Sequence, residues 1–185
     1  MPAVLLFDTN IWSDLVLGSE AERQHVQRRL AEWRAVHGSF AMATSRICVA
    51  EALVAARTRE AQQDRERAEG RLREEFDRPG LRVVELTDKI FGTEVHVSDR
   101  AAGLRADMIR RTRRLAPHAE ISEDGGKLKL PDALIAASCF CFSPPAVLFT
   151  KNARDFQVVD EKGAKAALPG LVVESLGPGG AGSES

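Results

Sequence analysis

The chain has 185 residues, of which 44% are hydrophobic, and this length and composition fit one compact domain with its own core. Its 26 Lys and Arg residues balance 27 Asp and Glu residues, which gives a formal net charge of -1. This balance excludes a protein that binds nucleic acid through overall positive charge, so any contact with RNA must come from a local patch. The apolar runs are too short for a signal peptide or a membrane span, and we expect a cytoplasmic protein.

The first predicted elements are a strand, a helix and a second strand. Residues 4–7 form a continuous apolar run that stops at Asp8, which is typical of a strand buried on both faces, as in a parallel sheet. Residues 21–36 carry apolar side chains at the spacing of one helix face. Residues 40–44 resemble a second short strand. The chain therefore begins with strand–helix–strand alternation.

A long helix and a third strand are expected next. Ser45 is a suitable N-terminal cap for a helix, and this helix is expected to continue through the charged stretch 57–77, whose side chains we expect to face solvent. The pair Pro79-Gly80 then ends the helix. Residues 81–86 supply the third strand.

The following segment is expected to be helical with one long loop. Thr87 and Asp99 each offer a cap for a further helix, and the second of these helices should end near Pro117. Residues 118–130 are expected to form a loop. Pro131 suits the first turn of a helix that should continue to about residue 142.

Two more buried strands are predicted near the end of the chain, at residues 146–150 and 171–176. Residues 177–185 form a Gly- and Ser-rich tail that is too polar to pack, and we expect it to be disordered. Strands that alternate with helices predict an α/β domain with a mostly parallel sheet. Such sheets bind their ligands beyond the carboxyl ends of the strands.

Four acidic residues stand out by their position in this pattern. Asp8 follows the first strand, Glu51 lies on the helix after the second strand, Asp132 opens a helix, and Asp155 follows the fourth strand. Each also has a purely structural explanation: a turn, a salt bridge to a buried Arg, a charge at a helix N-terminus, or an ordinary loop acid. Because the expected architecture directs most of them to one edge of the sheet, we expect them to converge.

Converging carboxylates indicate a metal site. Two carboxylates about 4 Å apart repel by about 4 kcal/mol at an effective dielectric constant of about 20, so an ionised cluster needs a cation. Mg²⁺ or Mn²⁺ takes oxygen ligands of this kind, whereas zinc would favour His or Cys, which are absent from the segments around the four acids. The chemistry indicated is phosphodiester hydrolysis.

Four sequence blocks around these acids resemble the PIN-domain family of nucleases, in particular its VapC-like toxins, and occur in the family's order. The blocks are LLFDTN (residues 5–10), TS with AEAL (44–45 and 50–53), LPDALIAA (130–137) and LFTKNARDF (148–156). The resemblance implies a three-layer α/β/α domain at residues 1–176. It also implies a Mg²⁺- or Mn²⁺-dependent endoribonuclease, the toxin of a type II toxin–antitoxin pair, which forms a homodimer and is restrained by a small antitoxin.

The resemblance also assigns roles to individual residues. The metal-binding and catalytic acids would be Asp8, Glu51, Asp132 and Asp155. Thr150 and Asn152 would line the pocket, and whether Asn152 or Asp155 completes the site is open. Asn10 would orient Asp8 or a water, with a role as helix cap as the alternative.

The spacing departs from the compact toxin pattern, because Asp132 follows Glu51 by 81 residues. We attribute the excess to a charged helical insertion around residues 57–78, whose arginines alternate with acids and receive no functional role. A more concentrated basic cluster is a candidate RNA contact and consists of Arg110, Arg111, Arg113 and Arg114. The alternative is that these cations simply suit a helix C-terminus.

Two other functions remain as alternatives. The fold could serve as an RNA- or protein-binding module without turnover, although the complete set of acids argues against this. A small α/β phosphatase could use Asp8 as a covalent nucleophile, but that chemistry usually needs a second acid two residues later, where Asn10 stands. The scattered histidines lie in no nucleophile motif, which argues against a catalytic triad.

Overall fold

The fold is known from a computed structural model that describes residues 3–115, 128–159, 165–168 and 170–176. Within these ranges, the side chains of residues 108, 111–115, 157–159 and 165–167 lie outside the description. The predicted tail at 177–185 and residues 118–127 of the predicted loop also lie outside the described residues.

A five-stranded parallel sheet forms the centre of the domain, in the order β3-β2-β1-β4-β7. Its strands are β1 (Ala3–Phe7), β2 (Phe40–Ser45), β3 (Leu81–Val84), β4 (Val147–Thr150) and β7 (Val173–Ser175). The sequence predicted all five. A separate antiparallel pair, β5 (Gln157–Val159) and β6 (Lys165–Ala167), was not predicted.

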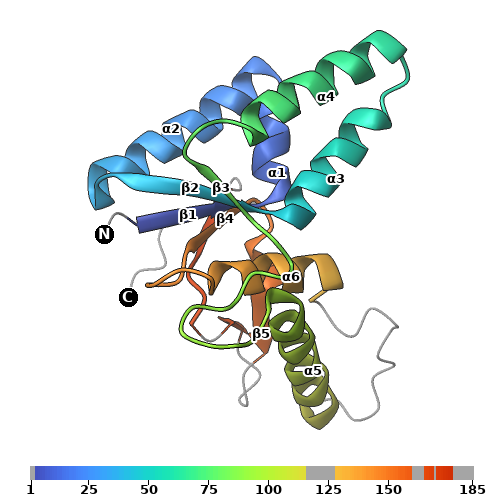
Figure 1. Cartoon of the computed structure of the whole chain (residues 1–185). Helices are drawn as coiled ribbons and strands as arrows, with labels where there is room; N and C mark the ends of the chain where they lie inside the picture. Colours follow the sequence, from blue (N-terminus) through green and yellow to red (C-terminus); the bar gives the residue numbers. More distant parts are fainter. Residues whose placement is uncertain (1–2, 116–127, 160–164, 169, 177–185) are drawn as a thin grey trace.

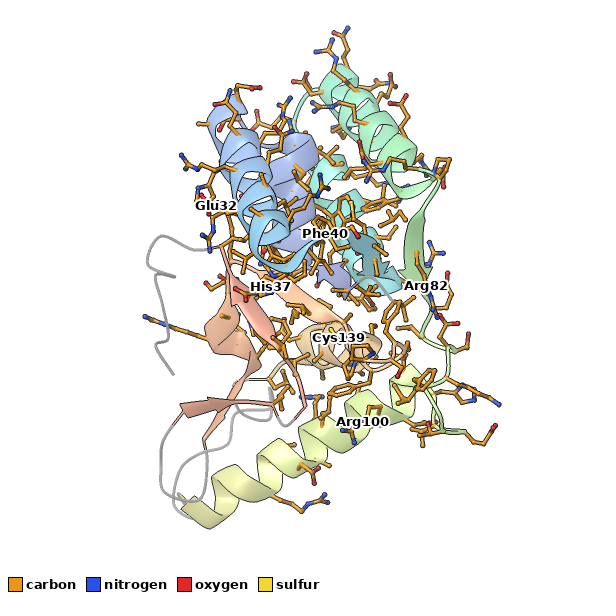
Figure 2. All side chains as sticks on the ribbon, turned by 90° about the vertical axis from the view of Figure 1, so that its left-hand side faces the viewer. Glu32, His37, Phe40, Arg82, Arg100 and Cys139 are labelled. Carbon is orange, nitrogen blue, oxygen red and sulfur yellow. The ribbon has the colours of Figure 1, made fainter. Side chains whose placement is uncertain are left out.

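Helices cover both faces of the sheet (Figure 1). On one face lie α1 (Thr9–Trp12), the π-helix η1 (Ser13–Leu17), α2 (Glu20–His37), α3 (Arg46–Arg57) and α4 (Gln62–Phe76). On the other lie α5 (Val97–Leu115) and α6 (Leu130–Cys139), and the short 3-10 helix η2 (Ala153–Phe156) follows β4. Figure 2 shows the same division, with Arg100 and Cys139 across the sheet from Glu32. The expected three-layer α/β/α fold with a parallel sheet is therefore confirmed.

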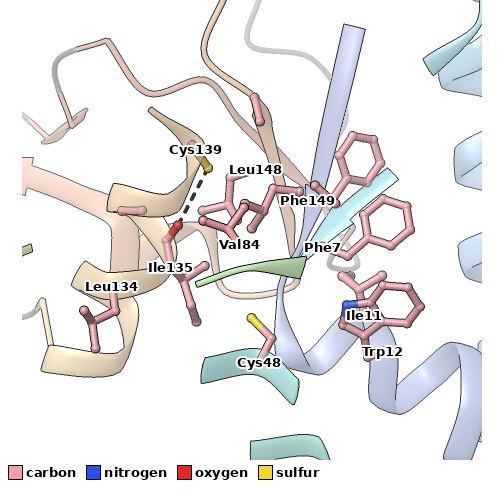
Figure 3. Close-up of a cluster of buried hydrophobic side chains, with 14 of the residues drawn as sticks. Phe7, Ile11, Trp12, Cys48, Val84, Leu134, Ile135, Cys139, Leu148 and Phe149 are labelled. Carbon is pink, nitrogen blue, oxygen red and sulfur yellow. Dashed lines mark hydrogen bonds between the residues drawn. The ribbon is translucent and has the colours of Figure 1, made fainter. Parts of the chain in front are cut away.

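The core lies between the sheet and its helices (Figure 3). Leu5, Leu6 and Phe7 are fully buried, as expected for a strand covered on both faces. The Trp12 ring packs 5.4 Å from that of Phe7 and 5.2 Å from that of Phe76 on α4, measured between ring centroids. Its Nε1 donates a hydrogen bond of 2.9 Å to the hydroxyl of Thr44, so this large side chain is buried without an unsatisfied polar atom.

The predicted long helix after Ser45 is in fact two helices. The side chain of Ser45 caps α3 as expected, but α3 ends at Arg57 and the chain turns back as α4. The two helices pack together, and the Arg57 guanidinium pairs with Glu69 at 2.8 Å. The expectation of a solvated second half was also wrong on one face, because α4 buries Ala68, Leu72 and Phe76.

Three other helix boundaries differ from the prediction. No helix begins at Thr87, whose carbonyl instead accepts a hydrogen bond from the His96 ring in an irregular connection. Asp99 lies in the first turn of α5 rather than at its cap. The helix that begins near Pro131 ends at Cys139, three residues before the expected position. No helix of the described residues is both long and apolar enough to cross a membrane.

Candidate functional site

The sheet has a switch point between β1 and β4, its two central neighbours. The chain builds the sheet outward from β1 through β2 to β3 and then crosses to the opposite side for β4. Open α/β sheets leave a crevice at such a point, beyond the carboxyl ends of the strands. The Asp8 amide donates to the Phe149 carbonyl at 3.0 Å and so joins the ends of these two strands. Asp8 therefore lies where this fold offers a ligand site.

Asp8 is held by three hydrogen bonds and is only 6% exposed. Its Oδ1 accepts from the Thr9 amide at 2.6 Å, which makes Asp8 the N-cap of α1. Its Oδ2 accepts from Asn10 Nδ2 at 2.8 Å and from the Thr150 hydroxyl at 2.6 Å. Burial raises the pKa of Asp8, the hydrogen bonds oppose the rise, and the charge of Glu51 adds to it. Asp8 thus has a fixed direction and an unfavourable negative charge.

Glu51 lies on α3 and is held by Thr9, whose hydroxyl donates to Glu51 Oε2. The apolar residues expected beside Glu51 only partly form the core, because Val54 is 59% exposed. The buried residues of α3 are Cys48, Val49, Ala52 and Ala56. In the described part of the chain no arginine pairs with Glu51, so the salt bridge considered as its structural role is not found.

Asp132 lies in the first turn of α6, and its pKa reports the charges around it. Its pKa is raised to about 6, first by burial and then by repulsion from Asp155, Asp8 and Glu51. These three acids come from three other segments of the chain. The charges of the other three predicted acids therefore all reach Asp132.

Asn152 and Asp155 lie in the segment that directly follows β4. The Asn152 amide donates to the Thr150 hydroxyl at 3.0 Å, while the Asn152 side chain is exposed. The Asp155 amide donates to the Asn152 carbonyl at 2.9 Å within the turn that begins η2. The charge of the Asp155 carboxylate acts on Asp132, whereas no contact of the Asn152 side chain with the four acids is found in the described residues.

The donor set at this site fits a hard divalent cation. It consists of four carboxylates, and Mg²⁺ and Mn²⁺ favour oxygen ligands. The Cys48 thiol lies near Asp8, but burial raises its pKa to about 12, so the thiol is neutral. In the described ranges no three His, Cys, Asp or Glu side chains form a group that could hold a metal ion as they stand. Ligation would therefore require a side chain, such as that of Glu51 now bonded to Thr9, to move.

The predicted basic cluster lies at the end of α5. Arg110 is exposed and pairs with Asp107 one turn earlier. The side chains of Arg111, Arg113 and Arg114 lie outside the described residues.

Sequence reasoning missed three residues at the site: Thr9, Asp14 and Lys151. Thr9 and Lys151 lie inside the motif blocks, so their position was a signal that was not used. Asp14 is buried on η1, and nothing in a single sequence predicts a π-helix there.

Comparison with known proteins agrees with this geometry. The sequence model of the PIN domain family matches residues 5–162, a segment that contains all four acids. The chain belongs to the PIN domain family. PIN domains are nucleases, so this chain is a member of a family that hydrolyses phosphodiester bonds. No curated protein sequence matches it significantly.

Solved structures share the fold of this PIN domain. VapBC2 from Rickettsia felis, bound to a DNA fragment from its promoter, is 15% identical with a TM-score of 0.52, over 93% of this chain and 98% of that one. DNA-bound VapBC from Salmonella typhimurium is 19% identical with a TM-score of 0.52, over 95% and 99%. FitAB bound to a DNA fragment is 15% identical with a TM-score of 0.52, over 93% and 94%.

Proposed function

We propose that this PIN-domain protein is a metal-dependent endoribonuclease that uses Asp8, Glu51, Asp132 and Asp155 to bind Mg²⁺ or Mn²⁺. The observation that carries the proposal is the gathering of acids from separate segments beyond the ends of β1 and β4, where Asp8 is fixed by Thr150 and the pKa of Asp132 is raised by burial and then by the charges of the other three acids. Such an arrangement costs stability unless a cation relieves it, and perturbed pKa values of this kind cluster at functional sites.

The chain's own residues would orient the donors and admit the substrate. Asn10 and Thr150 fix Asp8 Oδ2, and Thr9 holds Glu51 until the site is loaded. The exposed Asn152 side chain stands at the rim, where it could contact the RNA. When bound, the divalent ion supplies stabilisation of the negative charge that develops on the phosphate and favours deprotonation of the attacking water.

We further propose that the protein is the toxin of a type II toxin–antitoxin pair, acts in the cytoplasm and forms a homodimer. Its fold is shared with VapBC and FitAB complexes, which supports a small antitoxin as partner. Residues 1–176 would form the nuclease domain, with the segment around 57–78 as an insertion and 177–185 as a disordered tail. The arginine cluster at the end of α5 would contact RNA phosphates.

The test is cleavage of a structured RNA by the purified protein with Mg²⁺, with Mn²⁺ and in excess EDTA. We expect cleavage only with a metal ion. Asp8→Ala, Glu51→Ala and Asp132→Ala should each lower the cleavage rate by roughly a hundredfold or more, because even groups that only orient a metal ligand cost about 10- to 100-fold. Glu74→Ala, which removes an exposed acid of α4, is the matched control and should cleave like wild type.

Two outcomes would contradict the proposal. Undiminished cleavage in EDTA would exclude the metal mechanism. Binding of RNA without cleavage, equally strong in wild type and in the acid variants, would favour the alternative of a binding module.

A further inference from the structure

A largely buried ion pair lies beside the acid site. Lys151 Nζ is 2.5 Å from Asp14 Oδ2, and the side chains are 33% and 9% exposed. Arg46 and Glu85, a surface pair, are by comparison 49% and 43% exposed. No hydrogen bond to Asp14 Oδ2 is found in the described part of the chain, so Lys151 meets this oxygen as an ion-pair partner. A buried carboxylate is costly without a cation, so Asp14 depends on Lys151.

The backbone around Asp14 is built to bring it inward. Asp14 lies on η1, a π-helical turn, a type of turn that is rare and is often found at functional sites. Gly18 follows this turn, and a Cβ at Gly18 would lie 2.6 Å from the Asp14 carbonyl oxygen. The charge of Lys151 also helps to lower the pKa of Glu22, near the start of α2, after the hydrogen bonds from Ser19. Lys151 thus lies near one acid of η1 and one of α2.

The ion pair is linked to Asp8 through both of its members. Lys151 directly follows Thr150, and its amide donates to Asn10 Oδ1 at 3.0 Å. Thr150 and Asn10 are the residues that donate to Asp8 Oδ2. Asn10 and Asp14 lie one helical turn apart on the same continuous segment, α1 with η1. The end of β4 is therefore tied to this segment by two hydrogen bonds with the Asn10 side chain, from the Lys151 amide and to the Thr150 hydroxyl, and by the ion pair.

We propose that Asp14 and Lys151 are positioning residues of the acid site: their ion pair clamps the end of β4 onto η1 and so keeps Thr150 and Asn10 bonded to Asp8. The pair contacts neither the metal ion nor the RNA. The metal-binding part of this inference rests on the proposed function, whereas the clamp itself is a property of the metal-free protein.

The first readout needs no metal. The Lys151 amide is bonded to Asn10 only while the clamp holds, so its hydrogen exchange, followed by NMR in EDTA, reports the clamp directly. We expect roughly tenfold faster exchange of this amide in Asp14→Asn and in Lys151→Met, with exchange in the centre of β1 unchanged. Lys89→Met is the matched control, because Lys89 pairs with Glu94 on an exposed loop. In Lys89→Met, hydrogen exchange at the Lys151 amide should equal that of wild type.

The second readout is the affinity for Mn²⁺, measured as free Mn²⁺ by electron paramagnetic resonance. Loss of a group that orients a metal ligand costs roughly tenfold or more in affinity, and we expect this in both single variants. Because the two side chains act as one unit, Asp14→Asn/Lys151→Met should lose no more than the worse single variant. Lys151→Arg keeps the charge and should retain most of the affinity.

The double variant keeps the test decisive if a single variant does not fold, since it leaves no unpaired buried charge. The proposal would be overturned if, in the double variant, the amide of residue 151 exchanged at the wild-type rate and the Mn²⁺ affinity equalled that of wild type. Additive losses of Mn²⁺ affinity in the two single variants would also overturn it. So would a Lys151→Met protein that binds RNA weakly but has normal amide exchange at residue 151 and normal Mn²⁺ affinity, because Lys151 would then be an RNA contact. If wild type binds Mn²⁺ and cleaves no RNA, only the nuclease proposal fails. If it binds no Mn²⁺, exchange at Lys151 alone decides the clamp.

Discussion

At the scale of single residues, structural and functional roles coincide at Asp8. Its carboxylate caps α1 through the Thr9 amide, which is the structural role that an acid at this position can have. The same carboxylate accepts from Thr150, a residue 142 positions away. One oxygen serves the helix and the other is fixed within the acid cluster, so the two interpretations of Asp8 do not exclude each other.

Asp132 allows the combined cost of burial and of repulsion by the other acids to be measured. Its folded-state pKa of about 6 lies above the ordinary value of 3.8, so the folded protein holds this proton more tightly than the unfolded chain. The destabilisation is therefore absent below pH 3.8, grows as pH rises, and is complete above about pH 6. Each pKa unit corresponds to about 1.4 kcal/mol, and solvent screening of this partly exposed group leaves about 1–2 kcal/mol at neutral pH.

We accordingly expect Asp132→Asn in EDTA to melt about 2–6 °C above wild type at pH 7.5, with the difference shrinking toward pH 4.5. Thermal unfolding across this pH range measures it, and Glu74→Gln, at an exposed position, is the control. Mn²⁺ should stabilise wild type more than the variant, because the variant lacks a ligand. A variant less stable than wild type at pH 7.5 without metal would show that Asp132 is held by favourable partners instead.

At the scale of elements, the backbone of η1 leaves no room for a side chain at Gly18, whereas Gly70 on α4 has room for one. A Cβ at Gly18 would meet the Asp14 backbone at 2.6 Å, but a Cβ at Gly70 on α4 would meet no atom within 4 Å. Gly18→Ala must therefore displace η1, which we expect to destabilise the fold by about 1–3 kcal/mol. Gly70→Ala should stabilise it by about 0.5–1 kcal/mol, because alanine favours a helix.

Urea unfolding of both variants at neutral pH provides the comparison, and the opposite signs make each variant the control for the other. Gly18→Ala should also speed hydrogen exchange at the Lys151 amide, since displacement of η1 moves Asp14 away from Lys151. A Gly18→Ala protein as stable as wild type would mean that η1 relaxes without cost.

At the scale of the whole molecule, a net charge of -1 leaves RNA binding to local patches. Replacement of the four arginines of the α5 cluster with Gln should weaken RNA binding uniformly across sequences. These are Arg110, Arg111, Arg113 and Arg114. Each lost phosphate contact should reduce the slope of log K against log salt by about 0.7 for a single strand. The control variant loses the same four positive charges from the α3–α4 hairpin, through replacement of Arg59, Arg65, Arg67 and Arg71 with Gln.

Filter binding of a short RNA at several salt concentrations distinguishes the two sets. If both variants keep the wild-type slope, the α5 cations serve only their helix end, as the alternative interpretation holds. If the α3–α4 set has the larger effect, the hairpin is the RNA surface, and the expectation that it has no role is wrong.

Local patterns in the sequence determined the α/β class and the five strands of the sheet, because short apolar runs mark buried strands, and they made the four acids candidates for a site. Only the tertiary structure decided which ends meet. The crossover to β4 places Thr150 beside Asp8, and packing of Phe76 and Leu72 folds one expected helix into α3 and α4. Burial likewise pairs Asp14 with Lys151, two residues 137 positions apart. Such contacts depend on the free energy of joining distant segments, which local propensity does not contain.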